Sequence, residues 1–412
     1  MANKNDSQLC IVIENRFRGG LETVLLSLLD ECSKNGIRVT LLTNITNPSL
    51  KTITSRSFHN LHLVTIRNFA TRQFFTLDVC RNLKTDRLLM FPKSLVRKLF
   101  ELPLIIFTLR SYYKIFKRNS FDACLIINGG YPGSIACRAA AISWRLTKPH
   151  QPMAFAINGI VPSSRFGFRI MDMLLDSWFL KSSPMLIAVS DTCKNSFIQR
   201  NNVTAKQSVQ VILNGVRKSE ENQIIKAYKT RLNTNILTLA SYTTNKGHEF
   251  LFQCFASVLK SVPNAFLICA GDDPENRIPA LRELLLSLGI HESVNLMIFQ
   301  ENQNLLLDEC DIVAIPSQIS ESFSLVAAEA LCRGIPVVGT NVGAIPEIAP
   351  SGEGSHLFDK DDFGGFSRAI ILLLQDKAHY TETSYRAFMR SLQIPSETEM
   401  AKSYVKAVFN ES

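Results

Sequence analysis

The stretch PSQISESFSLVAAEALCRGIPVVGTNVGAIPE, residues Pro316–Glu347, decides how the rest of the chain is interpreted. It follows the apolar run Ile312–Ile315, which is typical of a buried parallel strand. Ser322 is a candidate N-cap, and the Ala- and Leu-rich segment Phe323–Cys332 predicts a helix after it. A glycine then leads into a predicted strand, Ile335–Val338. The loop and the helix start therefore lie at the carboxyl edge of a parallel sheet, where open α/β sheets bind ligands.

Two glutamates, Glu321 and Glu329, stand eight residues apart in this stretch. If Glu321 starts the helix, the two carboxylates are separated by about 12 Å along its axis. The carboxylates of a glycoside hydrolase lie about 5 to 9.5 Å apart, so a hydrolytic pair is disfavoured. The spacing favours two groups that hold different parts of one elongated ligand, with the amides of the helix start free for a phosphate. The alternative is structural, with Glu321 facing the helix dipole and Glu329 on the helix surface.

The order of these features resembles one enzyme family. Glu321-Ser-Phe-Ser-Leu-Val-Ala-Ala-Glu329, followed by Gly334-Ile-Pro-Val-Val and Gly343-Ala-Ile-Pro-Glu347, is similar to the E-x7-E region of family 4 (group 1) retaining glycosyltransferases. The resemblance implies the α/β GT-B fold, with two Rossmann-like doubly wound domains facing a central cleft. It also implies transfer of a hexose from a nucleotide-sugar, with a UDP-sugar favoured, to a glycan or lipid-linked acceptor in bacterial surface polysaccharide or lipopolysaccharide biosynthesis.

The same resemblance implies roles for particular residues. Glu321 would hold hydroxyls of the transferred sugar, Glu329 the ribose of the nucleotide, and Lys246 the leaving diphosphate. No obligatory metal or other cofactor is expected, because no D-x-D pattern stands at a strand end in the first half of the chain. The implied catalytic residues are Glu321, Lys246 and Asn158. The implied donor-binding residues are Gly19, Gly20, Lys246, Gly271, Asp272, Phe323, Ser324, Leu325 and Glu329.

The chain departs from the family pattern at three places. Most relatives have an arginine a few residues before Lys246, where this chain has Ser241 and Tyr242, so either another cation replaces it or donor binding is weaker. Ser324 stands where a glycine is usual, although its backbone amide can still contact phosphate. Asn158 stands where a histidine is common, and asparagine can donate a hydrogen bond but cannot hold positive charge. The candidate replacement cations are Arg16, Arg18 and Arg217.

Length and composition indicate two domains. A chain of 412 residues divides naturally into two domains of about 200 residues. We expect an acceptor-binding domain at 1–214, a nucleotide-sugar-binding domain at 215–390, and a helix at 391–412 that crosses back to the first domain. The N-terminus lacks a secretory signal and no apolar run reaches about 18 residues, so we expect a cytoplasmic protein without a membrane-spanning helix. The ten cysteines form no C-x-x-C pair. Those predicted to be small buried residues are Cys10, Cys124, Cys254 and Cys269.

The first half of the chain opens with a βαβ pattern. The strand Leu9–Ile13 runs into a loop containing Gly19 and Gly20, the helix Glu22–Lys34 and the strand Ile37–Thr43. Glycines at such a turn let the backbone approach a ligand, but the G-x-G-x-x-G fingerprint of a dehydrogenase is absent. The further predicted elements are strands at 61–66, 123–128, 153–157, 185–189 and 209–213, and helices at 93–117 (broken or bent near Pro103), 131–145 and 168–180.

The second half alternates between predicted strands and helices, which indicates a doubly wound parallel sheet. The helix at 247–260 follows Lys246, so that its amides and the lysine face the same side as the Glu321 loop. The alternative for Lys246 is a solvated turn lysine, and His248 is interpreted as a turn residue. The predicted strands are 236–240, 265–270, 294–299, 312–315 and 335–338, and the other predicted helices are 278–288, 304–310, 323–332 and 397–409.

The net charge of +9 is concentrated in one segment. Residues 67–118 contain twelve Lys or Arg and three acidic residues, an excess that equals the net charge of the chain. Nucleic acid is one candidate partner, but no recognised nucleic-acid motif accompanies the segment, so we expect none. Basic residues flanking the apolar run Leu99–Leu109 favour an amphipathic helix, within 93–118, that rests on the inner-membrane surface as a peripheral attachment. The alternative is a helix packed internally with solvated lysines. The basic residues are Lys93, Arg97, Lys98, Arg110, Lys114, Lys117 and Arg118.

Two further functional classes compete with a transferase. A non-catalytic relative that binds nucleotide-sugars as a scaffold is favoured by Ser241 and Asn158, and a test of donor hydrolysis separates it from an enzyme. Isomerisation or epimerisation of a sugar phosphate on a similar fold is weaker, because such enzymes lack this E-x7-E context.

Overall fold

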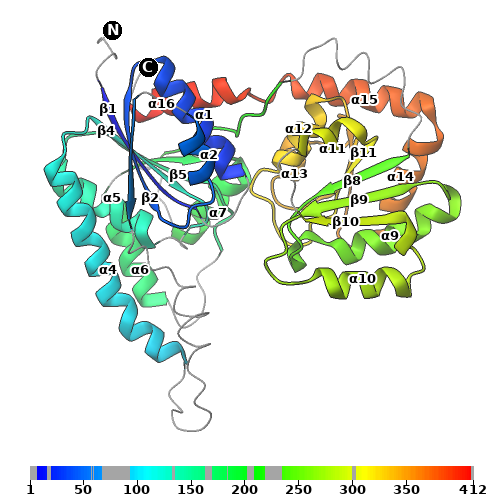
Figure 1. Cartoon of the computed structure of the whole chain (residues 1–412), viewed down its shortest axis with the longest axis horizontal. Helices are drawn as coiled ribbons and strands as arrows, with labels where there is room; N and C mark the ends of the chain where they lie inside the picture. Colours follow the sequence, from blue (N-terminus) through cyan, green and yellow to red (C-terminus); the bar gives the residue numbers. More distant parts are fainter. Residues whose placement is uncertain are drawn as a thin grey trace. The chain divides into compact units, whose positions relative to one another are not determined.

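The computed structural model describes residues 7–15, 20–56, 58, 60–66, 93–131, 135–162, 169–182, 184–201, 208–218, 234–298 and 303–409. The chain divides into two compact units. The first comprises Met1–Ile212 and Glu397–Ser412, and the second comprises Leu213–Ser396. Each unit is a parallel sheet flanked by helices, so both are α/β (Figure 1).

The first unit is built on a seven-stranded sheet in the order β3-β2-β1-β4-β5-β6-β7, and every strand pair is parallel. The central strands β4 and β5 are buried along their whole length, as expected for a parallel sheet covered on both faces. The bounds are β1 Gln8–Glu14, β2 Arg38–Asn44, β3 Leu61–Ile66, β4 Ala123–Asn128, β5 Met153–Ile157, β6 Met185–Ala188 and β7 Val209–Val211.

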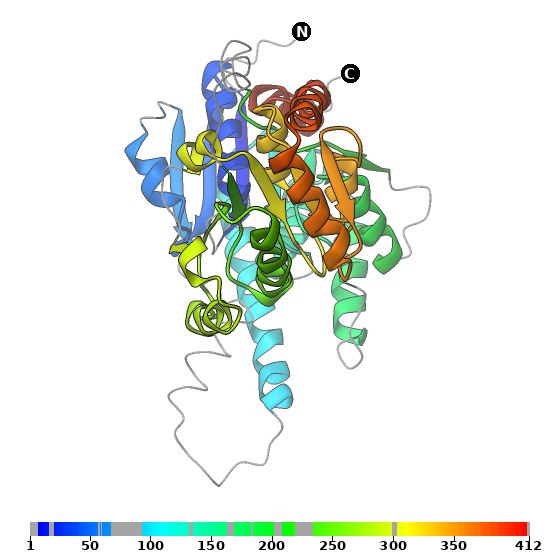
Figure 2. The same cartoon turned by 90° about the vertical axis from the view of Figure 1, so that its right-hand side faces the viewer.

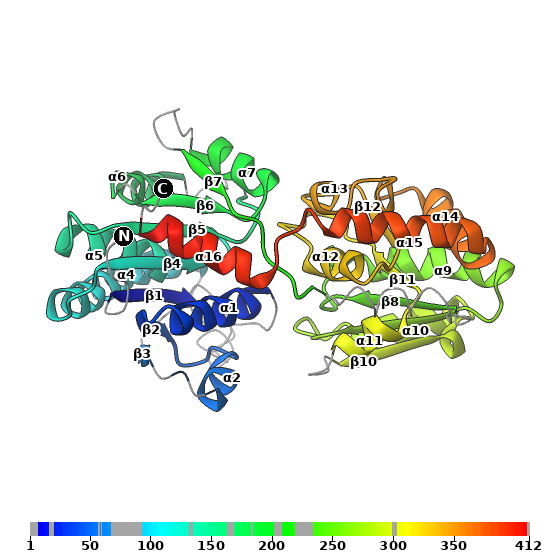
Figure 3. The same cartoon turned by 90° about the horizontal axis from the view of Figure 1, so that it is seen from above.

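The helices of the first unit pack on both faces of this sheet. The last helix, α16, lies beside α1 (Figure 3), and both contribute to one core cluster, for example through Leu28 and Tyr404. On the other face α4 packs along α5 through Tyr112, Phe116 and Trp144. The bounds are α1 Gly20–Lys34, α2 Leu50–Ser55, α4 Lys93–Arg118, α5 Ile135–Thr147, α6 Arg169–Lys181, α7 Asp191–Asn201 and α16 Glu397–Val408.

The second unit is built on a six-stranded parallel sheet in the order β10-β9-β8-β11-β12-β13. Its strands and the surrounding helices are drawn from green to orange in Figures 1 and 2. The strands are β8 Asn235–Leu239, β9 Phe266–Gly271, β10 Val294–Ile298, β11 Ile312–Ile315, β12 Val337–Thr340 and β13 Ser355–Phe358. The helices are η1 Thr244–Lys246, α9 His248–Ser261, α10 Ile278–Ser287, η2 His291–Ser293, α11 Gln303–Glu309, α12 Leu325–Cys332, α13 Ile345–Ile348, α14 Phe363–Gln375 and α15 Lys377–Ser391.

The predicted strands and helices occur in the predicted order in both units, but the structure also has elements that were not predicted, namely α2, α13, β13, α14 and α15. Of the two alternatives predicted near Pro103, a break or a bend, the break is wrong, because α4 continues as one helix through it. A proline removes one backbone hydrogen bond, and the buried packing of the later turns, including Ile105 and Tyr112, holds the helix together. The helix predicted at 323–332 starts later, at Leu325. The four cysteines predicted to be buried are buried and free. None of the described helices is long and apolar enough to cross a bilayer.

Candidate active site

Tyr242, which stands in the turn after β8, is part of the core of the second unit. Its ring is 0% exposed, and its hydroxyl lies 2.7 Å from the backbone oxygen of Cys269 and 2.9 Å from that of Met297. The same hydroxyl accepts a hydrogen bond from the Met297 amide at 3.1 Å. Burial raises the pKa of Tyr242. Tyr242 therefore connects the end of β8 to β9 and β10. This structural role accounts for a tyrosine in the region where most relatives have an arginine.

The turn that carries Lys246 is fixed against the loop after β11. Gly247 has φ +72°, and a Cβ at this position would lie 1.9 Å from the backbone oxygen of Pro316, so only glycine fits. The Gln318 amide donates a hydrogen bond to the Asn245 oxygen at 2.8 Å. Lys246 is the last residue of η1 and stands directly before Gly247 and α9. The close backbone contact therefore sets where the lysine side chain begins.

Glu321, in the loop after β11, forms an ion pair with Lys246. The Lys246 ammonium lies 2.5 Å from Glu321 Oε1, and the Ser317 hydroxyl donates to the same oxygen at 2.8 Å. Both charged side chains are partly exposed, 23% for Lys246 and 15% for Glu321. A ligand at this edge of the sheet would therefore meet a cation and a carboxylate together.

The loop after β12 holds the backbone of Glu321. Gly343 has φ +58°, and a Cβ at this position would lie 2.3 Å from the backbone oxygen of Glu321. The same backbone oxygen accepts a hydrogen bond from the Ala344 amide at 2.8 Å. Glu321 thus lies in a loop and does not start a helix, contrary to the assumption behind the predicted 12 Å separation from Glu329.

The start of α12 differs from the prediction. Ser322 is not its N-cap. The capping position is Ser324, which has φ +74° and makes no side-chain capping hydrogen bond. A positive φ favours glycine, so the serine carries backbone strain where the family usually has glycine. Phe323 is buried at 2% exposure and anchors the loop, and Leu325 is the first helical residue. The uncapped amides of this first turn are suited to an anion.

The remaining residue of the E-x7-E pattern, Glu329, lies on α12 between Leu325 and Cys332. It is partly buried, and its backbone oxygen accepts a hydrogen bond from the side chain of Arg333 at 3.0 Å. Glu321 and Glu329 are therefore on two different structural elements, a loop and the helix that follows it. This arrangement suits two contacts with separate parts of a ligand.

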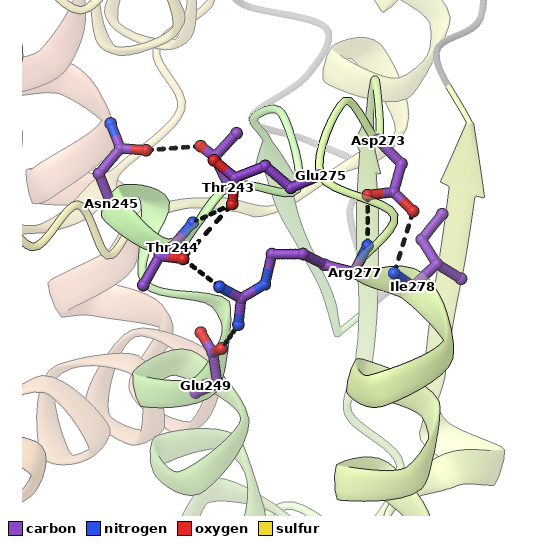
Figure 4. A network of polar contacts seen from close by, with 8 residues as sticks. All are labelled: Thr243, Thr244, Asn245, Glu249, Asp273, Glu275, Arg277 and Ile278. Carbon is purple, nitrogen blue, oxygen red and sulfur yellow. Dashed lines mark hydrogen bonds and ion pairs between the residues drawn. The ribbon is translucent and has the colours of Figure 1, made fainter. Parts of the chain in front are cut away.

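The loop after β9 is joined to the Lys246 turn by a polar network (Figure 4). Arg277 donates to the Thr244 hydroxyl and to the Glu249 carboxylate. Asp273 accepts from the Arg277 amide at 2.6 Å and from the Ile278 amide at 3.0 Å, and so caps α10. The network therefore connects the turn before Lys246 to the loop after β9 and to the first turn of α9.

Gly271 and Asp272 lie at the base of the same loop. A Cβ at Gly271 would lie 2.0 Å from the Ala240 oxygen, and the Asp272 oxygen accepts a hydrogen bond from the Tyr242 amide at 2.8 Å. The ends of β8 and β9 therefore pack backbone to backbone, which puts Gly271 and Asp272 beside the turn that leads to Lys246.

His248 is buried next to the two cations of this region. It is 1% exposed, its ring lies 4.9 Å from that of Tyr242, and it is the first residue of α9 rather than a turn residue. Burial, followed by the charges of Arg277 and Lys246, lowers the pKa of His248 to about 4. The His248 imidazole near Lys246 is therefore neutral at pH 7.

The predicted residues fall into two groups. Lys246, Gly271, Asp272, Phe323, Ser324, Leu325, Glu321 and Glu329 lie in the second unit, on loops and helix starts after β8, β9 and β11. Asn158 and Gly20 lie in the first unit, after β5 and at the first position of α1. Gly19, Arg16 and Arg18 lie outside the described residues, and Arg217 is exposed.

Sequence reasoning missed Arg277, Ser317 and the role of Gly343. Ser317 was within the quoted stretch, and its spacing of four residues from Glu321 was a usable signal. Arg277 carried no signal, because its contact with Thr244 joins positions 33 residues apart.

Comparisons with known proteins agree with this architecture. The family "Glycosyltransferase Family 4" matches residues 18–220, and "Glycosyl transferases group 1" matches residues 233–376. The chain is 28% identical over 214 residues to N-acetyl-alpha-D-glucosaminyl L-malate synthase of Bacillus anthracis, a match to 50% of this chain. It spans 55% of the length of that relative and smaller shares of other curated relatives.

Two solved structures are similar over nearly the whole chain. A glycosyltransferase from Rickettsia africae has a TM-score of 0.73 at 14% identity, with 99% of this chain and 100% of that chain covered. Anabaena HepE in complex with UDP has a TM-score of 0.71 at 17% identity, with 98% and 100% covered. At these identities the likeness concerns the fold.

Proposed function

Because the chain belongs to the family 4 (group 1) glycosyltransferases and has the GT-B fold, we propose that it transfers a hexose from a UDP-sugar to an acceptor hydroxyl with retention of the anomeric configuration. The acceptor is a glycan or a lipid-linked glycan of bacterial surface polysaccharide, such as lipopolysaccharide. The observation that carries the proposal is the contact between Lys246 and Glu321 at the carboxyl edge of the second sheet.

The proposed mechanism uses the second unit to hold the donor. Lys246 neutralises the diphosphate as it becomes the leaving group, and the uncapped amides after Ser324 donate to its oxygens. Glu321 accepts hydrogen bonds from hydroxyls of the transferred sugar, and Glu329 from the ribose. The acceptor hydroxyl attacks the anomeric carbon on the face that the diphosphate leaves, and its proton passes to the departing phosphate oxygen, so no protein nucleophile is required.

The choice of donor is supported by one relative in particular. Anabaena HepE was solved with UDP, with UDP and glucose, and with UDP-glucose. The proposed reaction includes no metal ion, since Lys246 supplies the positive charge at the diphosphate. We expect turnover to be unchanged by excess EDTA.

The direct test is release of UDP from UDP-sugars, with GDP- and ADP-sugars as comparison donors. A thermal-shift series on the same compounds gives a second readout, because a ligand at 100 times its Kd adds about 2.7 kcal/mol of stability. UDP release together with stabilisation by UDP-sugars supports the proposal. Stabilisation without UDP release, with or without acceptor, would instead support a nucleotide-sugar-binding scaffold, the alternative favoured by the absence of the family arginine at Ser241.

The helix α4 supports a further part of the proposal, peripheral attachment to the inner membrane. Its outer face exposes Ile106 (47%), Phe107 (48%) and Tyr113 (39%). Arg110 and Lys114 are exposed on the same face, at helical spacing from these apolar residues. No acidic residue occurs between positions 105 and 118. An apolar and basic face of this kind suits an anionic leaflet, where each basic residue contributes about 1 kcal/mol.

Co-sedimentation with vesicles tests this attachment. Replacement of Arg110, Lys114 and Lys117 by Glu should weaken binding to phosphatidylglycerol-containing vesicles by at least about 3 kcal/mol, roughly 100-fold. The matched control replaces three other exposed lysines, Lys51, Lys402 and Lys406, by Glu, so that both variants change the net charge of the chain by the same amount. Equal loss in both variants, or binding to neutral vesicles at high salt, would contradict attachment through α4.

A further inference from the structure

Two histidines of the second unit face each other between β13, the last strand of its sheet, and the helix α15. His356 is the second residue of β13, and His379 is the third residue of α15. Their Nε2 atoms lie 3.2 Å apart, and the ring centroids lie 5.3 Å apart. Both residues are half-buried, so solvent reaches part of the pair. In the described part of the chain, the side chain of each histidine bonds only to the other.

The distance between the two nitrogens fits a metal ion as well as a shared proton. Two neutral imidazoles can share one proton, with one ring as donor and the other as acceptor. The distance of 3.2 Å is at the long end of the usual range for hydrogen bonds from N–H donors. A tetrahedral zinc ion binds histidine nitrogens at about 2.0–2.1 Å, which places two of them about 3.3–3.4 Å apart. The pair can therefore take up zinc with a shift of only about 0.1–0.2 Å.

Regular backbone structure holds both histidines in place. His356 is the register partner of Val338 on β12. The first turn of α15 is capped by Asp376, whose Oδ1 accepts from the Ala378 amide at 2.9 Å and from the His379 amide at 3.0 Å. The same carboxylate offsets the positive end of the helix, which by itself disfavours a cation near His379. The two ligand nitrogens are thus positioned before a metal ion binds, as a precise site requires.

The chemistry of the pair selects a class of metal ion. Burial, followed by the charge of His379, lowers the pKa of His356, so this imidazole is in the neutral form that binds metals at pH 7. Imidazole nitrogens suit zinc, nickel and copper, whereas magnesium and calcium prefer oxygen ligands. Among the described residues no third His, Cys, Asp or Glu completes a metal-binding group, so water supplies the remaining ligands.

The pair lies away from the candidate active site. Tyr380, next to His379, donates a hydrogen bond to the backbone oxygen of Asp311 at 3.1 Å. Asp311 directly precedes β11, so the start of α15 lies at the amino edge of the sheet. Lys246 and Glu321 follow the carboxyl ends of β8 and β11, at the opposite edge. A metal ion at the pair therefore connects β13 to α15 without contacting the donor.

We infer that His356 and His379 form a zinc-binding site that joins the edge strand of the second sheet to α15. The two Nε2 atoms and water molecules coordinate the ion, and each imidazole keeps its proton on Nδ1. The site is separate from the proposed glycosyl transfer, and its occupation stabilises the second unit.

The first test is calorimetric titration of the chain with zinc chloride. His356→Gln and His379→Gln each remove one ligand nitrogen, and His291→Gln is the control at an exposed histidine of the same unit. All proteins carry Cys80→Ser, because Cys80 lies outside the described residues and the other nine cysteines are buried. The chain should bind one zinc ion. Each variant of the pair should raise the Kd for zinc at least tenfold, since changes outside the ligand set alone cost that much, and His291→Gln should change it less than twofold.

Hydrogen exchange gives a second readout, on stability. At a free zinc concentration ten times the Kd, amides of β13 and α15 that exchange by opening the site should exchange about tenfold more slowly. Excess EDTA should reverse the effect, and magnesium chloride at the same concentration should not produce it. In His356→Gln, zinc at this concentration should leave the exchange of these amides unchanged.

The outcomes that overturn the inference are specific. One is unchanged zinc affinity in both variants of the pair, and another is the absence of binding to the chain at millimolar zinc. A crystal soaked in zinc chloride gives a readout that does not depend on how the variants fold. An anomalous peak at about 2.1 Å from both Nε2 atoms supports the inference, and peaks at other residues alone overturn it.

Discussion

The buried neutral histidine behind Lys246 makes the second unit sensitive to acid. The pKa of His248 is about 4 in the folded chain and about 6.5 in an unfolded one. Between these values the unfolded chain binds more protons, so the free energy of unfolding falls as the pH is lowered. The full effect is about 3 kcal/mol, at about 1.4 kcal/mol per pH unit, and about 2 kcal/mol of it is lost between pH 7 and pH 5.

The perturbation that isolates this effect is His248→Phe. A phenyl ring keeps the contacts with Tyr242 and Phe252 and removes a ring nitrogen, Nε2, that is buried without a hydrogen bond. The variant should therefore lose about 2 kcal/mol less than the wild type between pH 7 and pH 5. The exposed His62 provides the control, since His62→Gln should follow the wild-type curve.

The assay must report on the second unit. Both tryptophans of the chain, Trp144 and Trp178, lie in the first unit, so their fluorescence does not follow the region around His248. Hydrogen exchange of the α9 amides, measured by mass spectrometry at several urea concentrations, reports on the correct region. Identical pH dependence in His248→Phe and the wild type would refute the reasoning.

Three further predictions concern the same unit. Ser324→Gly removes the cost of a positive φ in a residue with a side chain, about 1–2 kcal/mol, against about 0.5–1 kcal/mol of glycine entropy, so the Tm should rise by about 2 °C. The control Ser287→Gly, within a helix, should lower the Tm. A lower Tm in both variants would contradict backbone strain at Ser324. Ser241→Arg restores the guanidinium usual in the family and should tighten UDP binding about tenfold in calorimetry; unchanged or weaker binding would mean that another cation already fills the space. Gly343 has φ +58°, and Gly343→Ala would place a methyl group 2.3 Å from the backbone oxygen of Glu321. The variant should therefore have a Tm several degrees lower and release UDP more slowly. A wild-type Tm would show that the loop accommodates the methyl group without a loss of stability.

The sequence was sufficient for the order of strands and helices because their signals are local. Apolar runs such as Ile312–Ile315 mark buried strands without reference to the rest of the chain, and the structure has that strand at the predicted bounds. That Lys246 and the Glu321 loop lie on the same side of the sheet also followed from topology, since both were predicted after parallel strands whose carboxyl ends share one edge, but their ion pair was not predicted.

Other features could not be predicted, because they depend on contacts between distant residues. Ser324 has a left-handed backbone conformation at the start of α12, whereas propensity rules favoured Ser322 as the cap. Ser241 and Tyr242 stand where most relatives have an arginine, and the sequence alone did not reveal that the Tyr242 hydroxyl bonds to β9 and β10.

The measurement that tests the central claim most directly is the rate of UDP release from UDP-glucose by Glu321→Gln. Glutamine can still accept from Lys246 and Ser317 but lacks the charge that strengthens hydrogen bonds to the sugar, so we predict a fall of roughly 100- to 1,000-fold, about 3 to 4 kcal/mol of barrier. The unfolding temperature should be nearly unchanged, and Glu292→Gln, at an exposed site in η2, should release UDP at the wild-type rate. A wild-type rate in Glu321→Gln would contradict the claim that this loop holds the donor sugar during transfer.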